Sequence, residues 1–172
     1  LVLLNGFFVA AEFAIVKVRI SQIQVRTSQS FSARMAKSVV ENLDGYLAAT
    51  QLGITLASLG LGWIGEGVVS KVILSIFNGL GLEMSETLAH QIALPVAFAT
   101  ITILHIVFGE LAPKSLAIRY PTQTTLSLSP PLRLFFVIFK PFIWILNGLA
   151  NFFLKMMGIR PVPHSEIHSE EE

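Results

Sequence analysis

The sequence of 172 residues contains no cysteine, which excludes a disulfide framework, a thiolate zinc site and a cysteine nucleophile. Charged side chains are also scarce: they make up 13% of the chain, against roughly 25% in average soluble proteins. The formal net charge is +1, so the chain lacks the basic surface typical of nucleic-acid-binding proteins. Glycine-rich phosphate loops, nucleophile elbows and metalloprotease helix motifs are missing as well. We therefore expect a protein that is not an enzyme.

Hydrophobic residues are abundant, at 53% of the chain, and the mean hydropathy is +0.68. This composition excludes a disordered chain, a coiled coil and a collagen-like repeat. It predicts an all-α membrane protein with three transmembrane helices and a juxtamembrane or interfacial belt of helices.

Three segments are long and apolar enough to predict membrane spans: residues 1–16, 46–64 and 92–108. The first is short against the ~20 residues that a bilayer requires, and the sequence opens without a methionine. We therefore expect that a few residues of this helix precede Leu1. A signal peptide is the alternative, but the basic leader and the small-residue cleavage site of such a peptide are missing.

Polar segments separate these spans and predict three domains or regions. Residues 35–43 form an amphipathic pattern that predicts a short surface helix, and residues 114–129 look like a linker closed by Pro130 and Pro131. We assign residues 1–131 to a three-span transport core, 132–160 to an interfacial amphipathic belt and 161–172 to a cytoplasmic linker.

The belt segment also permits a second interpretation. Arg133, Lys140 and Asn147 recur every seven residues, which places them on one face of a helix, as expected for a helix in the membrane interface. A fourth membrane span is the alternative. In either case Pro141 is expected to bend the helix or split it in two.

Basic residues are distributed unevenly around the spans. Those between the first and second spans are Lys17, Arg19, Arg26, Arg34 and Lys37. Those after the third span are Lys114, Arg119, Arg133, Lys140, Lys155 and Arg160. The loop between the second and third spans has Lys71 alone, beside Glu66, Glu83 and Glu86. The positive-inside rule therefore predicts an external N-terminus and a cytoplasmic C-terminus, in the cell (plasma) membrane.

Two acidic residues fall near the cytoplasmic ends of predicted spans, where an ionisable group is costly. Glu12 lies five residues before Lys17, and Glu110 lies four residues before Lys114. At this similar depth the two carboxylates predict a cation site. Alternatively, Glu12 pairs with a basic neighbour and Glu110 lies at the level of the lipid headgroups.

The segment Gly109-Glu110-Leu111-Ala112-Pro113-Lys114 carries a further signal. In an α-helix the amide of residue 113 bonds the carbonyl of Gly109, but proline has no amide hydrogen. The Gly109 carbonyl is then free beside the Glu110 carboxylate, and such oxygens bind hard cations. A plain helix stop at the interface is the alternative.

The second span contributes hydroxyl groups, and histidine and asparagine lie in the other two. Thr55 and Ser58 share one helical face and either bond neighbouring helices or point oxygens into the cavity of Glu110. Asn5, with Gly6, is a candidate for local unwinding of the first span, and His105 for a hydrogen bond between helices.

Three motifs together resemble the CorC/cyclin-M (CNNM) family: residues 4–14 (LNGFFVAAEFA), 51–55 (QLGIT) and 109–114 (GELAPK). The resemblance covers nearly the whole chain and is most specific in the third motif. It implies the transmembrane domain of that family: three spanning helices with a helical belt, assembled as a homodimer in the lipid bilayer. It also implies that cytoplasmic CBS domains, which bind ATP, follow residue 172, and that nucleic acid is not a partner.

The resemblance implies divalent-cation transport, mainly Mg²⁺ efflux exchanged for Na⁺, through a site that opens to the cytoplasm between the three helices. The acid of that site corresponds to Glu110, the principal charged ligand, and Gly109, Thr55 and Ser58 would supply neutral oxygens. Glu12 would complete the site or hold the first span against the basic end of the third. Ala11 takes the place of a serine that well-studied members have before the first acid.

The site departs from the family pattern in having fewer amide and hydroxyl oxygens. Ala10 and Ala11 stand near the first acid, and Ile54, Thr55 and Ser58 stand where magnesium transporters have asparagines. Fewer such oxygens make a poorer site for dehydrated Mg²⁺, so Na⁺ is the alternative ion. The alternative function is a non-transporting dimeric anchor for a cytoplasmic nucleotide sensor.

Overall fold

The computed structural model describes residues 1–25, 30–80 and 86–158, and every regular element in these ranges is a helix. The elements are α1 (Val2–Lys17), α2 (Ile20–Gln24), α3 (Phe31–Glu41), α4 (Leu43–Gly79), α5 (Glu86–Leu104), the π-helix η1 (His105–Leu111), α6 (Ala112–Arg119) and α7 (Pro121–Met156). The predicted all-α fold is therefore confirmed. Residues 161–172, the predicted cytoplasmic linker, lie outside the described residues.

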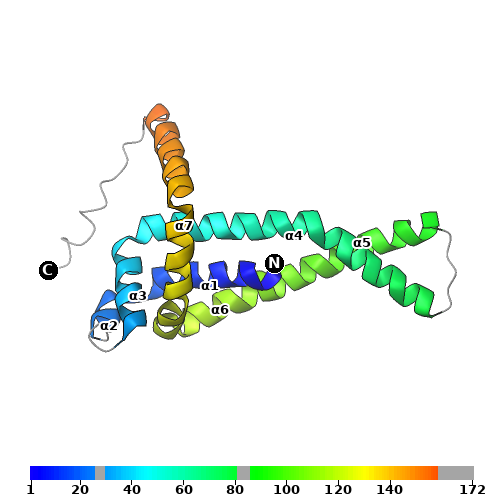
Figure 1. The fold of residues 1–172 in the computed structure, drawn as a ribbon, viewed down its shortest axis with the longest axis horizontal. Helices are drawn as coiled ribbons and strands as arrows, with labels where there is room; N and C mark the ends of the chain where they lie inside the picture. Colours follow the sequence, from blue (N-terminus) through cyan, green and yellow to red (C-terminus); the bar gives the residue numbers. More distant parts are fainter. Residues whose placement is uncertain (26–29, 81–85, 159–172) are drawn as a thin grey trace.

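The helices form a lengthwise group with one crosswise member. Helices α1, α4 and α6 lie alongside one another, with η1 next to α1. Helix α5 crosses the far part of α4, and most of α7 stands across the lengthwise helices (Figure 1). The short helices α2 and α3 gather at the end where α1 and α6 finish. Asn5 at the start of α1 and Gly109 of η1 therefore lie on elements that run side by side.

Three helical stretches are long and apolar enough to cross a membrane: α4, residues 95–119 and α7. Helix α4 has 37 residues, about 55 Å at 1.5 Å per residue, which exceeds the bilayer core of ~30 Å. The predicted spans 46–64 and 92–108 lie within α4 and within α5–η1. Helix α1, with 16 residues, is shorter than a full span.

The region expected to be a linker, residues 114–129, is helical instead. Helix α6 continues the third span to Arg119, and α7 begins at Pro121. The prediction was wrong because Pro121 occupies the first turn of α7, where its fixed φ suits a helix and its missing amide hydrogen costs nothing. The buried hydroxyls Thr125 and Ser129 also fit the helix, since the Ser129 hydroxyl donates to the Thr125 carbonyl at 2.6 Å.

Helix α7 is continuous from residue 121 to residue 156, although it contains Pro130, Pro131 and Pro141. Pro141 therefore does not split the segment. Figure 1 shows the first turns of α7 end-on and the remaining length upright. Pro130 and Pro131 explain this change of direction, because they remove two consecutive helical hydrogen bonds. The predicted boundary between residues 131 and 132 falls inside this helix.

Aromatic contacts fix α7 against the lengthwise helices. The Phe8 ring of α1 packs edge-on against Phe135 at 4.7 Å between ring centroids, and Tyr46 of α4 stacks on Phe136 at 4.4 Å. Leu132, only 1% exposed, belongs to the same core. Aromatic pairs add stability beyond the apolar area that they bury.

The predicted surface helix at residues 35–43 is present, but with different ends. Helix α3 begins at Phe31 because the Ser30 hydroxyl accepts a hydrogen bond from the Ala33 amide at 3.1 Å, an N-cap. It ends at Glu41, and Leu43 already belongs to α4. The side-chain sulfur of Met35 accepts a hydrogen bond from Arg133 of α7, which ties this belt helix to the crosswise one.

Candidate functional site

The side chain of Asn5 is the centre of a buried polar junction between three helices. Asn5 is 2% exposed and lies in the first half of α1. Its Nδ2 donates to the Gly109 carbonyl of η1 at 2.9 Å, and its Oδ1 accepts from the Ser58 hydroxyl of α4 at 3.2 Å. The first distance is ordinary for an N–H···O hydrogen bond, and the second is long for an O–H···O bond. One amide side chain thus joins all three lengthwise elements at one point.

The π-helix η1 explains why the Gly109 carbonyl needs this partner. The Ala112 amide bonds the Val107 carbonyl, five residues back, rather than the carbonyl four residues back. Pro113 follows and brings no amide hydrogen, so the backbone hydrogen-bond ladder is interrupted here. Helix π-bulges of this kind occur frequently at functional sites.

The sequence predicted a free Gly109 carbonyl, and this prediction was wrong in one respect. The carbonyl accepts the Asn5 hydrogen bond and Gly109 is buried. A carbonyl oxygen has two lone pairs, so it keeps the capacity to accept one further donor or to bind a cation.

Gly6, the neighbour of Asn5, allows α1 to approach η1 closely. A Cβ atom at residue 6 would lie 2.7 Å from the Phe108 carbonyl oxygen and 2.9 Å from Pro113 Cγ. Only glycine fits this distance. The Asn5-Gly6 pair therefore faces two consecutive carbonyls, those of Phe108 and Gly109, and α1 does not unwind at these residues.

Helices α1 and α4 also pack closely at Gly53, five residues before Ser58. A Cβ atom at Gly53 would lie only 2.4 Å from the ring of Phe8, so the ring covers the bare backbone of α4. Small residues let neighbouring membrane helices approach closely, and Gly53 has this effect between α1 and α4.

The side chain of Glu110 follows Gly109 directly but does not enter the junction. It is exposed, and it forms no hydrogen bond or ion pair with another residue in the described ranges. The Thr55 hydroxyl is also outside the junction: it donates to the Gln51 carbonyl of its own helix at 2.8 Å. Of the predicted oxygen donors, the structure brings together Gly109 and Ser58.

The remaining predicted site residues lie further along α1. Glu12 is partly buried and has no ion-pair partner within residues 1–25, 30–80 and 86–158. Lys114, at the basic end of the third span, places its Nζ over the Phe13 ring, 4.5 Å from the centroid. Ala11 is 1% exposed and packs in the apolar core with Phe8.

His105 opens the π-helix and points its Nδ1 atom toward Gly109. This atom is buried and has no hydrogen-bond partner among the residues that the structure describes. It lies 3.5 Å from the place where a Cβ of residue 109 would be. The hydrogen bond between helices that the sequence suggested for His105 is therefore not made by Nδ1.

Asn5 is the residue of this site that sequence reasoning missed. The sequence did contain a signal for a buried contact at Asn5. An asparagine in an apolar span needs partners for its amide hydrogens and its amide oxygen. The sequence alone did not show which carbonyl on another helix lay opposite.

Comparison with known proteins places these features in a family. The chain matches the cyclin M transmembrane N-terminal domain (CNNM) family over residues 1–172. It is 48% identical over 174 residues to the UPF0053 protein YhdT of Bacillus subtilis, covering 100% of this chain and 37% of that protein. It is 45% identical to YrkA, with 100% and 40% covered, and 43% identical to YugS, with 98% and 39% covered, both of the same organism.

The chain thus spans about two fifths of the length of these relatives. The family match takes in all three motifs: the Asn5-Gly6 segment, the Gly53 segment and the Gly-Glu segment of the π-helix. With its long apolar helices and its membrane-domain motifs, the chain belongs to the cyclin M (CNNM) transmembrane domain family.

Proposed function

We propose that the domain moves a divalent cation, Mg²⁺, across the membrane by alternating access, in exchange for Na⁺ and without covalent chemistry. The observation that carries this proposal is the buried junction of Asn5, Ser58 and Gly109, where three long helices meet through polar atoms. Polar groups inside membrane domains mark ion pathways or hold helices together, and both tasks need such a point of convergence.

The oxygen ligands of the cation would come from η1 and from α4, the two elements that Asn5 joins to α1. Gly109 would use its second carbonyl lone pair, and Ser58 its hydroxyl oxygen. Glu110 would be the principal charged ligand, while Thr55 and Glu12 would complete the site from α4 and α1. The side chain of Ala11 offers no oxygen, so bound waters would fill part of the coordination shell, as Mg²⁺ commonly requires, and Na⁺ is the alternative ion.

The π-helix supplies a way to move the acid. Conversion of η1 into a regular α-helix shifts the backbone register by one residue, which rotates the residues on one side by about 100°. Such a rotation would swing the exposed Glu110 toward the Asn5 junction. The Asn5 amide would then give up the Gly109 carbonyl to the cation. These two arrangements of one helix correspond to the two states that alternating access requires.

The distribution of basic residues and the crosswise helix support a proposed orientation for the domain. The basic residues near α2, α3 and α6 would face the cytoplasm, and α7 would lie in the membrane interface as a belt. The relatives are more than twice as long as this chain, which leaves room for cytoplasmic CBS domains that bind ATP. The domain would work as a homodimer.

Replacement of Glu110 by glutamine tests the assignment, because it removes the charge and keeps the size. We expect Mg²⁺ flux into vesicles that contain the purified protein to fall at least about tenfold, toward the level of empty vesicles. The control is Glu41→Gln on α3, whose carboxylate is exposed and pairs with Lys37 at 3.5 Å. Unchanged flux in the Glu110 variant, with normal insertion, contradicts the proposal.

The second candidate is a membrane anchor that does not transport ions. It is favoured by one observation: Glu110 and Thr55 are both exposed and neither joins the buried junction. In an anchor the hydrogen bonds of Asn5 would serve packing alone. Ion binding separates the two candidates, because only a transporter needs a cation site.

A further inference from the structure

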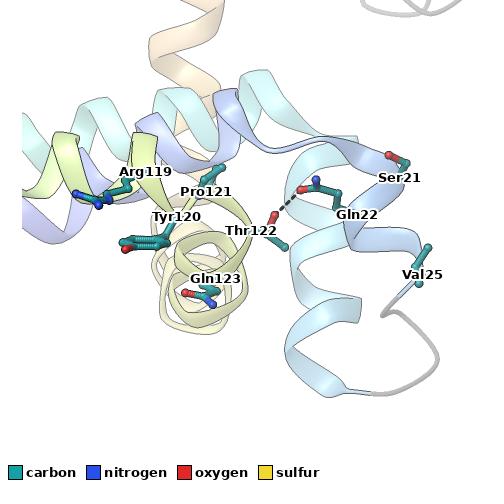
Figure 2. A pocket seen from close by; sticks show the side chains of 8 residues that line it. All are labelled: Ser21, Gln22, Val25, Arg119, Tyr120, Pro121, Thr122 and Gln123. Carbon is teal, nitrogen blue, oxygen red and sulfur yellow. Dashed lines mark hydrogen bonds between the residues drawn. The ribbon is translucent and has the colours of Figure 1, made fainter.

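Polar side chains in the pocket beside α2 either form a hydrogen bond or face outward. This pocket of about 690 Å³ lies where α6 meets α7. There the Thr122 hydroxyl donates to Oε1 of Gln22 at 2.6 Å, and the exposed Arg119 side chain points away from this pair (Figure 2). Among the residues that the structure describes, two polar side-chain atoms are buried without a partner: Thr125 Oγ1 on α7 and His105 Nδ1 on η1. The second of these atoms lies beside the buried junction of the three helices.

The Nδ1 atom of His105 is an unused hydrogen-bonding position. A neutral imidazole carries one ring proton, and with that proton on Nε2 the Nδ1 atom is an acceptor. A buried acceptor without a donor has lost its hydration and gained no bond in return, so it destabilises the arrangement in which it occurs. A donor that reaches Nδ1 therefore stabilises the arrangement that brings it there.

The Asn5 amide is a donor that lies close to this acceptor. Gly109 has no side chain, and the point where its Cβ atom would be lies 3.2 Å from Asn5 Nδ2 and 3.5 Å from His105 Nδ1. Both nitrogens thus border the same place beside the bare α-carbon of Gly109. Nδ2 has two protons, and it donates to the Gly109 carbonyl at 2.9 Å. Because Asn5 is only 2% exposed, bulk water does not compete for this amide.

The Asn5 amide has two arrangements at this place. In the one observed, Nδ2 bonds the Gly109 carbonyl and His105 Nδ1 is left without a donor. In the other, a rotation of the amide turns Nδ2 toward His105 Nδ1, and the Gly109 carbonyl is left for another partner. A hard cation is such a partner, because it binds carbonyl oxygens. With a cation on the carbonyl and the amide on the ring, each of the three polar groups is satisfied.

We propose that His105 is the positioning residue that receives the Asn5 amide when a cation takes the Gly109 carbonyl. This inference rests on the proposed function and adds to it a reason why cation binding and the rearrangement of the junction occur together. The unpaired Nδ1 destabilises the empty arrangement, and its new hydrogen bond stabilises the loaded one. Both effects raise the affinity for the cation. His105 itself does not touch the cation, and its ring stays neutral throughout.

Cation binding by a variant of His105 tests this role. The purified protein in detergent is unfolded by heat in Mg²⁺, Na⁺ or choline at equal ionic strength, and the dependence on cation concentration gives the affinity. His105→Phe keeps an aromatic ring and removes the acceptor, so we expect its Mg²⁺ affinity to fall about tenfold. In choline the same variant should unfold at the wild-type temperature or above it, because the unpaired acceptor is gone. A residue that serves packing alone would show the reverse pattern.

Three further variants provide a rescue, a control and a test of the coupling. His105→Asn places an amide oxygen near the position of Nδ1, and this acceptor should restore most of the affinity. Thr100→Val is the matched control, because Thr100 is exposed on α5 and its hydroxyl donates to the Val96 carbonyl of its own helix at 2.8 Å. Its affinity should equal that of the wild type. In an Asn5→Ala background, His105→Phe should cause no further loss, since the ring then has no amide to receive.

A second measurement needs no variant that could fail to fold. The ¹⁵N NMR signals of the histidine rings in the wild-type protein distinguish a free Nδ1 acceptor from one that accepts a hydrogen bond. Addition of Mg²⁺ should move the Nδ1 signal of His105 toward the hydrogen-bonded position, and choline should leave it in place. A signal that Mg²⁺ does not move contradicts the proposal.

Other results overturn this role for His105 and leave the proposed function intact, as long as the wild-type protein responds to Mg²⁺ or Na⁺. They are an unchanged affinity in His105→Phe, an equal loss in His105→Phe and His105→Asn, and a full tenfold loss from His105→Phe in the Asn5→Ala background. A wild-type protein that responds to neither cation more than to choline is a different outcome. It contradicts the proposed function itself, and the role of His105 falls with it.

Discussion

Asn5 shows what a single polar residue contributes inside an apolar helix. Its amide satisfies the Gly109 carbonyl and the Ser58 hydroxyl at the same time, with 2.9 and 3.2 Å between the bonded atoms. The sequence indicated Gly109 and Ser58 as sources of oxygen ligands. Pro113 leaves the Gly109 carbonyl without a helical partner, and Ser58 shares a helical face with Thr55. The residue between them was not predicted, since the pairing depends on how α1 and η1 are aligned.

Replacement of Asn5 by alanine leaves the Gly109 carbonyl and the Ser58 hydroxyl without their partner. We expect the free energy of unfolding to fall by about 1–2 kcal/mol, measured as a lower unfolding temperature in detergent. Asn151→Ala is the matched control, because Asn151 is exposed on α7 and its side chain has no hydrogen bond among the described residues. Equal unfolding temperatures for the two variants would show that the junction does not stabilise the fold.

At the scale of elements, the contact between α1 and η1 depends on local backbone shape. The π-helix includes Gly109 and Glu110 and lies just before Pro113. The sequence predicted an interrupted backbone hydrogen-bond ladder at this point, because proline has no amide hydrogen. The sequence did not reveal that the interruption takes the form of a π-helix and not a helix end. The reason is that the chain continues as α6, held by Ala117, which is fully buried against Ala14 and Ala10 of α1.

Gly6→Ala tests this contact, since the new Cβ would lie 2.7 Å from the Phe108 carbonyl oxygen. Helices α1 and η1 must then move apart, and we expect a loss of about 1–3 kcal/mol in the free energy of unfolding. Gly62→Ala on α4 is the control, because nothing lies within 4 Å of its new Cβ. That control should gain up to about 1 kcal/mol from its better helix propensity. Two changes of the same sign would count against a tight contact at Gly6.

At the scale of the whole molecule, three lengthwise elements and one crosswise helix form a unit that covers two fifths of its relatives. The exposed surface of α4, α5 and α7 carries many large apolar side chains, such as Trp63, Phe98 and Trp144. Apolar exposure of this extent is expected where lipid or a second subunit covers a membrane domain.

Ion binding by the whole domain separates a transporter from an anchor. An ion that binds only the folded state raises the unfolding temperature through linkage, by about 2.7 kcal/mol of free energy at 100 times its dissociation constant. We expect Mg²⁺ or Na⁺ to raise the unfolding temperature relative to choline at equal ionic strength, and Glu110→Gln to abolish the rise. Indifference of the wild-type domain to the identity of the cation favours the anchor.

The sequence alone determined that this chain is a helical membrane domain and where its apolar helices lie, because the apolar runs and the basic residues that flank them are local features. The motifs around Gly53 and Gly109 also marked the family. Only the tertiary structure decided that α7 crosses the other helices, that residues 114–129 are helical and that Asn5 meets Gly109 and Ser58. These outcomes depend on which surfaces of distant segments face each other, and hydropathy along the chain carries no information about that alignment.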